Sequence, residues 1–213
     1  MLHSIMNRRL RFLLISLLLG VYACSPAQQK DRPASIITKP VELTRTAGTF
    51  RLTKSTALIL SSNEYHLAEC AVYFAEYIKP ATGFQLKAQS GTQPKPNSIF
   101  LHIVKDELLG VEGYGLTITQ DHIEIRAIDR SGIFYGLQSL LQLLPAEISS
   151  ELRLTDVVWD APCVTVRDAP RFQWRGMHLD VCRHFFPVSF IKTYIDMIDY
   201  NIRTLVQAVA QRK

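Results

Sequence analysis

The alternation of apolar and polar positions predicts a small domain of strands and helices in the middle of the chain. β-Branched and apolar residues alternate over residues 49–60, which indicates a strand. Residues 64–83 instead show apolar positions at helical spacing after a capping segment, Ser61 to Asn63. Pro80 and Gly83 are expected to end this helix. Its predicted buried positions are Leu67, Cys70, Ala71, Phe74, Ala75 and Ile78.

Three further strands and a second helix are predicted downstream. Residues 98–104, 113–119 and 122–128 have strand patterns, and the two-residue connection Gln120-Asp121 predicts a hairpin between the last two. A helix is expected between Arg130 and Pro145, where one apolar stripe contains Ile133, Leu137, Leu140, Leu141 and Leu144. This order favours an α+β fold, with an antiparallel or mixed sheet that carries both helices on one face.

The last part of the chain predicts a different architecture. Residues 146–170 contain Pro162 and Pro170 and are interpreted as rich in loops. The segment RGMHLDV, residues 175–181, is apolar enough for a buried parallel strand. A helix should start at Pro187, with Phe190, Ile191, Tyr194, Ile195 and Ile198 on one side. A strand, a short loop and a helix form the first unit of a β/α series.

The first 24 residues have the organisation of a bacterial export signal. A cationic region precedes an apolar run from Phe12 to Ala23, which is too short to span a bilayer as a helix. Val21-Tyr22-Ala23-Cys24 resembles a lipobox, in which Cys24 would be lipidated and become the new N-terminus. The alternative is a plain secretory signal, and Met6 is an alternative start. The polar residues 25–39 suit a flexible tether.

Composition and charge narrow the possible functions. The chain has 213 residues, 47% of them hydrophobic, which fits a globular protein. Its net charge is +5, but Arg8, Arg9 and Arg11 belong to the expected signal, and its removal leaves 21 basic and 19 acidic residues, a net charge of +2. We see no basic stripe with interleaved aromatic residues, so we do not expect nucleic-acid binding.

Three cysteines remain after the signal: Cys70, Cys163 and Cys182. Their spacing fits no zinc pattern, and an odd number gives no convincing disulfide framework. Cys70 lies in the apolar pattern of the first helix and is expected to be a small buried residue. We predict neither a metal nor a cofactor.

Two long segments resemble the β-N-acetylhexosaminidases of glycoside hydrolase family 20. EGYGLTITQDHIEIRAIDRSGIFYGLQSLLQLLP, residues 112–145, is similar to the small α+β domain that precedes the catalytic barrel in that family. DAPRFQWRGMHLDVCRHFFPVSFIKTYIDMI, residues 168–198, resembles the opening of the barrel itself, and RGMHLDVCRHFF argues against another glycosidase family. The N-terminal pattern gives a signal peptide (1–23) and a lipid-anchor tether (24–39). The resemblance implies the small domain (40–150), a linker (151–170) and a truncated (β/α)8 barrel (171–213).

The resemblance implies hydrolysis of terminal non-reducing N-acetyl-β-hexosamines by a substrate-assisted, retaining mechanism. The acetamido oxygen of the substrate attacks the anomeric carbon, an aspartate orients that group, and a neighbouring glutamate is the general acid and base. This Asp-Glu pair belongs to a later barrel strand, beyond residue 213, so we expect no catalytic residue here. A full barrel takes about 250 residues, and the sequence after Asn201 departs from the family pattern.

We therefore expect a truncated or frame-shifted product, or a gene fragment, that is inactive by itself. The alternative function is a non-catalytic, lipid-anchored accessory or interaction domain. Either would be a lipoprotein of the bacterial cell envelope, and glycans with terminal N-acetylhexosamine would be partners of the complete enzyme. Without neighbouring barrel strands, an apolar patch is expected at Phe185, Phe186, Phe190, Ile191 and Ile195.

Barrel geometry ranks the polar residues of the opening segment. Chemistry in such barrels lies at the carboxyl ends of the strands, so Arg175, at the amino end, is interpreted as structural. Arg183 lies just past the carboxyl end, and the resemblance implies that it binds sugar hydroxyls; the alternative is an ion pair with Asp180. Asp180 and His184 are possible supporting residues. His178 and Asp180 face one way, but two ligands do not make a metal site.

Overall fold

The structure is a computed structural model that describes residues 34–61, 65–172, 174, 179–183 and 185–195. Seven strands form one mixed sheet in this described part, in the order β1-β7-β5-β6-β4-β2-β3. The strands are β1 (Glu42–Arg51), β2 (Ala57–Leu60), β3 (Ala88–Ser90), β4 (Ser98–Ile103), β5 (Tyr114–Ile118), β6 (His122–Ala127) and β7 (Asp160–Asp168). The helices are α2 (Tyr65–Thr82) and α3 (Arg130–Leu143), with the 3₁₀ turns η1 (Glu107–Leu109) and η2 (Ala146–Ser149).

The two halves of the sheet differ in strand direction. β1, β7, β5 and β6 pair antiparallel, whereas β6, β4, β2 and β3 pair parallel. In β6 the alternation in the sequence determines which side chains face the core. Ile123, Ile125 and Ala127 are buried, while Arg126 is exposed. The predicted α+β fold with a mixed sheet and the β5–β6 hairpin are both confirmed.

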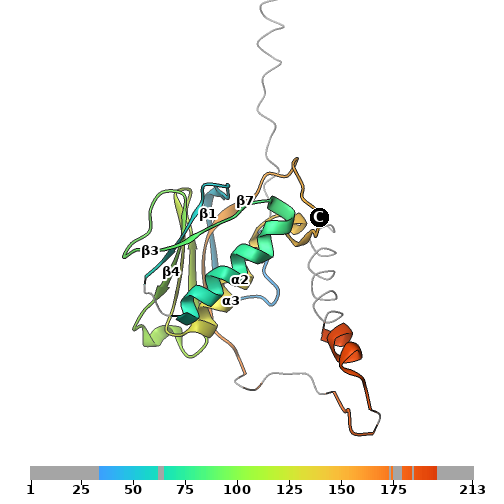
Figure 1. Ribbon diagram of the computed structural model, residues 1–213. Helices are drawn as coiled ribbons and strands as arrows, with labels where there is room; N and C mark the ends of the chain where they lie inside the picture. Colours follow the sequence, from blue (N-terminus) through green and yellow to red (C-terminus); the bar gives the residue numbers. More distant parts are fainter. Residues whose placement is uncertain (1–33, 62–64, 173, 175–178, 184, 196–213) are drawn as a thin grey trace, which may run out of the picture. The chain divides into compact units, whose positions relative to one another are not determined.

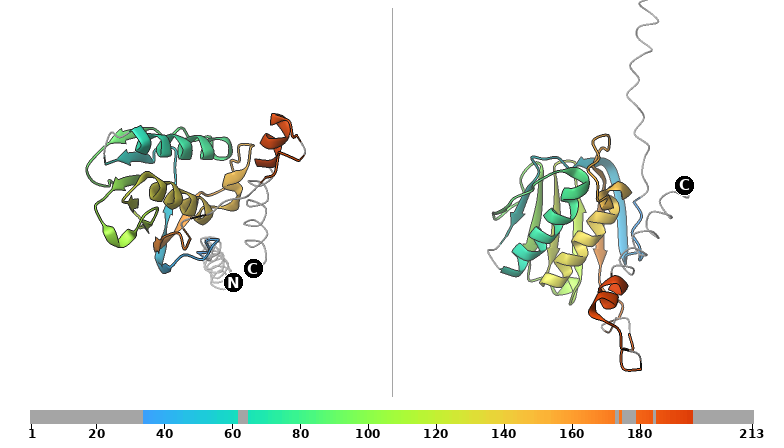
Figure 2. Two further views of the ribbon diagram at one scale, coloured as in Figure 1. Left: turned by 90° about the horizontal axis from the view of Figure 1, so that it is seen from below. Right: turned by 45° about the vertical axis from the view of Figure 1, so that its right-hand side comes forward.

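Both helices cover the same face of the sheet, where they lie side by side (Figures 1 and 2). The predicted stripe of α2 is buried at Leu67, Cys70, Ala71, Phe74 and Ile78, and that of α3 at all five positions. One boundary differs from the prediction, because α2 continues past Pro80 to Thr82. Gly83, at φ +71°, then reverses the chain in a backbone conformation that a side chain would strain.

Close contact fixes α3 against the strands beneath it. Asp129 caps the helix, since its Oδ1 accepts a hydrogen bond from the Gly132 N–H at 2.8 Å, and its Oδ2 accepts one from the Glu112 N–H at 2.9 Å. A side chain at Gly132 would come within 2.2 Å of the Gly113 carbonyl oxygen. The buried Tyr114 hydroxyl of β5 lies 2.5 Å from the Ser139 hydroxyl of α3. These contacts tie the beginning and the second half of α3 to the first residue of β5 and the two residues before it.

The interpretation of residues 146–170 as loop, and of 151–170 as a linker, is wrong for residues 160–168, which form β7 between β1 and β5 in the sheet. Pro162 lies inside this strand although proline cannot donate to a ladder. Its place is possible because β7 pairs with β5 only from Val164 onward, so that at Pro162 it has β1 alone as neighbour. The β1 register also shifts just before Thr49, the partner of Pro162.

Two other boundaries are corrected at the start of the domain. The strand expected over residues 49–60 is two strands, β1 and β2, separated by a turn in which the Thr56 hydroxyl accepts from the Thr53 N–H at 2.9 Å. The tether expected to reach residue 39 ends earlier, because Ile36 is buried. The Gln142 side chain of α3 also exchanges two hydrogen bonds with the backbone of Ile37.

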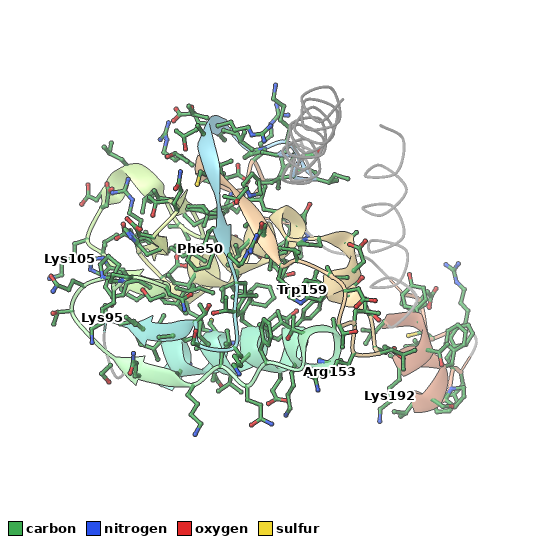
Figure 3. All side chains as sticks on the ribbon, turned by 90° about the horizontal axis from the view of Figure 1, so that it is seen from above. Phe50, Lys95, Lys105, Arg153, Trp159 and Lys192 are labelled. Atoms are coloured by element: carbon green, nitrogen blue, oxygen red, sulfur yellow. The ribbon has the colours of Figure 1, made fainter. Side chains whose placement is uncertain are left out.

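The core closes within the small domain. Its buried members run from Ile36 to Val166, and they include Phe50 of β1 and Trp159 just before β7 (Figure 3). The Leu52 N–H donates to the Trp159 carbonyl oxygen at 2.8 Å, which extends the β1–β7 pairing. Lys95 and Lys105, also labelled in Figure 3, are by contrast exposed. The small domain therefore needs no core residue from the segment that follows Pro170.

The described part of that following segment contains one helix, over residues 188–195, and the Pro187 carbonyl oxygen accepts from the Phe190 N–H at 2.9 Å. This confirms the predicted helix start. Of the strand predicted over residues 175–181, residues 175–178 lie outside the described residues, and residues 179–181 are not in a strand. A parallel barrel strand depends on hydrogen bonds to its neighbours.

None of the helices in the described ranges is long and apolar enough to cross a membrane.

Candidate functional site

The predicted site residues Asp180 and Arg183 lie together in a short loop before the 188–195 helix. Asp180 Oδ1 accepts from the Cys182 N–H at 2.9 Å and from the Arg183 N–H at 3.4 Å. Its other oxygen lies 3.4 Å from Arg183 Nε, so the carboxylate both shapes the loop and faces the guanidinium. The Arg183 side chain is 87% exposed, and an ion pair so open to solvent contributes little stability.

An exposed arginine in this position can bind but not transfer protons. The guanidinium stays protonated at any physiological pH, and its planar donors can reach two hydroxyl groups at once. With Asp180 on one side only, most of the Arg183 donor surface faces solvent. The arrangement therefore provides hydrogen-bond donors for a polar ligand such as a sugar.

Apolar side chains surround the same loop. The predicted patch is confirmed at Phe185, Phe190 and Ile195, which are exposed, while Phe186 and Ile191 are half-buried. The rings of Phe186 and Phe190 stack with their centroids 4.4 Å apart. These two rings therefore cover one another at the start of the helix. Phe185 and Ile195 keep apolar surface available for a partner.

Several predicted residues cannot be compared with the structure. Arg175, His178 and His184 lie outside the described residues, as do the proposed signal and its Cys24. In the part of the chain that is described, no group of three or more His, Cys, Asp or Glu side chains could hold a metal ion.

The two thiols of the small domain, Cys70 and Cys163, are expected to be unreactive at neutral pH. Burial raises the pKa of Cys70, and it also raises the pKa of Cys163, so both stay protonated at neutral pH. The predicted role of Cys70 as a small buried residue is confirmed by its place in the core. Cys182 is exposed, and all three cysteines are free.

Sequence reasoning missed the residues that hold the end of β7, because it interpreted this strand as loop. Arg167 makes a bidentate ion pair with Glu42 of β1, with Nη2–Oε1 and Nε–Oε2 distances of 2.6 and 3.2 Å. Hydrogen bonding to Arg167 lowers the pKa of Glu42. Asp168 Oδ1 accepts from the Val41 N–H at 3.1 Å. The alternation of Val164, Thr165, Val166 and Arg167 was the available signal for this strand.

Two sequence families match successive parts of the chain. The family described as glycosyl hydrolase family 20, domain 2, matches residues 34–169, and the glycosyl hydrolase family 20 catalytic domain matches residues 172–201. The first match therefore ends at β7, and the second contains Asp180 and Arg183.

The chain is also similar to curated proteins and to solved structures that are named as hexosaminidases. The chain is 34% identical to a beta-hexosaminidase of Porphyromonas gingivalis, over 86% of this chain and 24% of that protein. It is 28% identical to a beta-N-acetylhexosaminidase of Cellulomonas fimi, over 80% of this chain and 33% of that protein. A mutant Streptomyces plicatus beta-hexosaminidase in complex with its product, GlcNAc, superposes with a TM-score of 0.68 at 30% identity, over 78% of this chain and 32% of that one. The chain thus spans a quarter to a third of the length of these relatives.

Proposed function

Because this chain belongs to glycosyl hydrolase family 20, we propose that it forms the first part of a β-N-acetylhexosaminidase that removes terminal N-acetyl-β-hexosamine residues from glycans. The observation that carries this proposal is the order of the two family matches, domain 2 followed directly by the start of the catalytic domain. The complete enzyme would use the acetamido group of the substrate as nucleophile, and its Asp-Glu pair would come from a later barrel strand. The 213 residues by themselves would not catalyse hydrolysis.

Arg183 would bind hydroxyl groups of the terminal sugar in this enzyme. Two observations support the role: its side chain is open to solvent, and Asp180 holds both its backbone N–H and one edge of its guanidinium. Asp180 would then position Arg183 rather than touch the sugar. His184 would support the same loop.

The chain would work at the bacterial cell envelope, anchored through lipid on Cys24. This part of the proposal rests on the N-terminal sequence alone. Labelling of cells with a radioactive fatty acid would test it. Label should enter the wild-type chain and be lost in Cys24→Ser, and equal labelling of both chains would contradict lipidation.

The test of the enzymatic proposal compares the chain, without its signal, with a version extended after residue 201 by the remaining barrel of the P. gingivalis relative. Both would be assayed with a chromogenic N-acetyl-β-glucosaminide. We expect activity only in the extended protein. Arg183→Ala in the extended protein should raise KM, because binding to hydroxyl groups is lost, and Arg183→Lys should restore part of it. Activity of the short chain, or a folded but inactive extended protein, would count against the proposal.

A second candidate function is a non-catalytic accessory domain. The closed core of the small domain favours it, since all core residues in the described ranges lie between Ile36 and Val166. Such a domain would bind an envelope partner without the barrel. Glycan-array binding by the short chain, together with an inactive extended protein, would favour this function over hydrolysis.

A further inference from the structure

The chain leaves the small domain through three consecutive residues that are each held by a different contact. Arg167 is paired with Glu42, as described, and Asp168 accepts a hydrogen bond from the Val41 N–H. Ala169 packs closely on Gly113, where an added side chain would come within 3.2 Å of the Ala169 methyl group. Pro170 follows and stiffens the backbone further. The direction in which the next segment starts is therefore fixed by contacts on several sides.

A rigid loop, residues 105–113, borders this exit. Arg167 Nη1 donates to the Leu108 carbonyl oxygen at 3.4 Å, which joins the loop to the end of β7. Asp106 caps η1 through a 3.1 Å hydrogen bond from the Leu108 N–H, and the Glu112 N–H is held by Asp129. Leu109 is buried and anchors the centre of the loop. The loop conformation is thus determined by several independent bonds.

This rigid loop nevertheless turns two apolar side chains outward. Leu108 is 82% exposed and Val111 is 75% exposed. Because the backbone around them is held and their neighbour Leu109 is buried, their exposure is a property of the loop and not of a loose segment. Leu108 and Val111, the exposed apolar pair, form a fixed surface beside the exit.

The match to the catalytic domain begins at Phe172, five residues after the Arg167 that touches this loop. Five residues reach no farther than about 18 Å, so the catalytic segment starts close to the pair, and a short tether raises its effective concentration there into the millimolar range. The segment also has apolar surface to bury, since Phe172 is exposed and Trp174 is 93% exposed. Contact between the two would remove both apolar surfaces from water.

We propose that Leu108 and Val111 are the docking surface for the start of the catalytic domain, and that Phe172 and Trp174 are the side chains that dock there. The pair holds this segment against the small domain, so that the loop carrying Asp180 and Arg183 starts from a fixed point. The inference rests on the proposed function only in naming the domain that follows. Its test measures how well the segment is protected from trypsin and does not measure enzymatic activity. The docking inference and the proposed function can therefore fail independently.

The experiment measures tryptic cleavage after Arg171 and Arg183 in the full chain by mass spectrometry. Cleavage of a segment that docks reversibly follows its open population, so the double variant Leu108→Ser/Val111→Ser should be cut at least about three times faster. The apolar double variant Leu108→Ile/Val111→Leu should remain as protected as the wild type. Thermal unfolding should be unchanged in both, because the substituted side chains lie at the surface.

Leu152→Ser/Val158→Ser is the matched control. These two side chains are 76% and 53% exposed, and Val158 lies just before β7, at the end opposite the exit. We expect its cleavage rate to equal that of the wild type. Equal rates in all proteins would overturn the proposal. So would equal acceleration in both serine variants, which would show a general effect of lost apolar surface.

Discussion

A single buried hydroxyl pair shows how residues join the two layers of this domain. Tyr114 comes from the sheet and Ser139 from α3, and their hydroxyl groups meet at 2.5 Å inside the core. Removing one partner would leave the other buried without its hydrogen bond, which costs about 1–3 kcal/mol. Burial raises the pKa of Tyr114 to about 12, so the phenol remains neutral at any physiological pH.

Tyr114→Phe should therefore change stability in a pH-dependent way. In the unfolded chain a tyrosine loses its proton near pH 10, so the stabilisation from the raised pKa is complete below pH 10 and is lost as pH rises toward 12. Urea unfolding should show the wild type about 1–2 kcal/mol more stable at pH 8, with a difference that shrinks above pH 10. Tyr114→Phe/Ser139→Ala is the control, since it leaves no unpaired hydroxyl. A difference that stays constant between pH 8 and pH 11.5 would contradict the shift.

At the scale of elements, the sequence predicted those whose pattern is local. The stripes of α2 and α3 repeat at helical spacing, β6 alternates, and β4 and β5 are short, mostly apolar strand segments, so each could be placed from its own residues. β7 could not, because Pro162 argues against a strand wherever both neighbours pair, and only the sheet shows that one neighbour is absent there. The proposed role of Arg183 came from the family resemblance, since one exposed arginine carries no pattern.

The start of α3 is an element boundary that the sequence marks clearly, because Asp129 stands directly before the apolar stripe. Asp129→Ala removes both the cap at Gly132 and the bond to Glu112, and it should cost about 2 kcal/mol of unfolding free energy. Asp129→Asn keeps an acceptor for Gly132 but replaces one oxygen with a donor, so we expect roughly half of that loss. Urea denaturation followed by circular dichroism would measure both. Equal losses would show that the Glu112 bond, and not the cap, dominates.

At the scale of the whole molecule, stability is concentrated in the small domain. Among the residues that the structure describes, every core residue lies between Ile36 and Val166, whereas Phe185 and Ile195 of the later segment are exposed. The family boundary between residues 169 and 172 falls at the same point. The small domain should therefore unfold as one cooperative unit.

A chain that spans residues 34–170 should melt within about 2 °C of the chain that spans residues 34–213, because a difference below 1 kcal/mol shifts the midpoint only slightly. Differential scanning calorimetry would measure both. A chain that stops at residue 158 is the control, and it should not fold, because it lacks β7. A clearly lower midpoint for the 34–170 chain would show that the later segment contributes to the core.

The position of β7 also sets the order of events during synthesis. In the described part of the chain, β1 is the first strand in sequence and pairs only with β7, the last. The ladder hydrogen bonds of β1 therefore cannot form until β7 has been synthesised. Contacts between residues so distant in sequence slow folding and leave strand edges open in the meantime. A nascent chain halted before residue 160 keeps both β1 and one side of β5 unpaired, and such open strand edges are prone to aggregate.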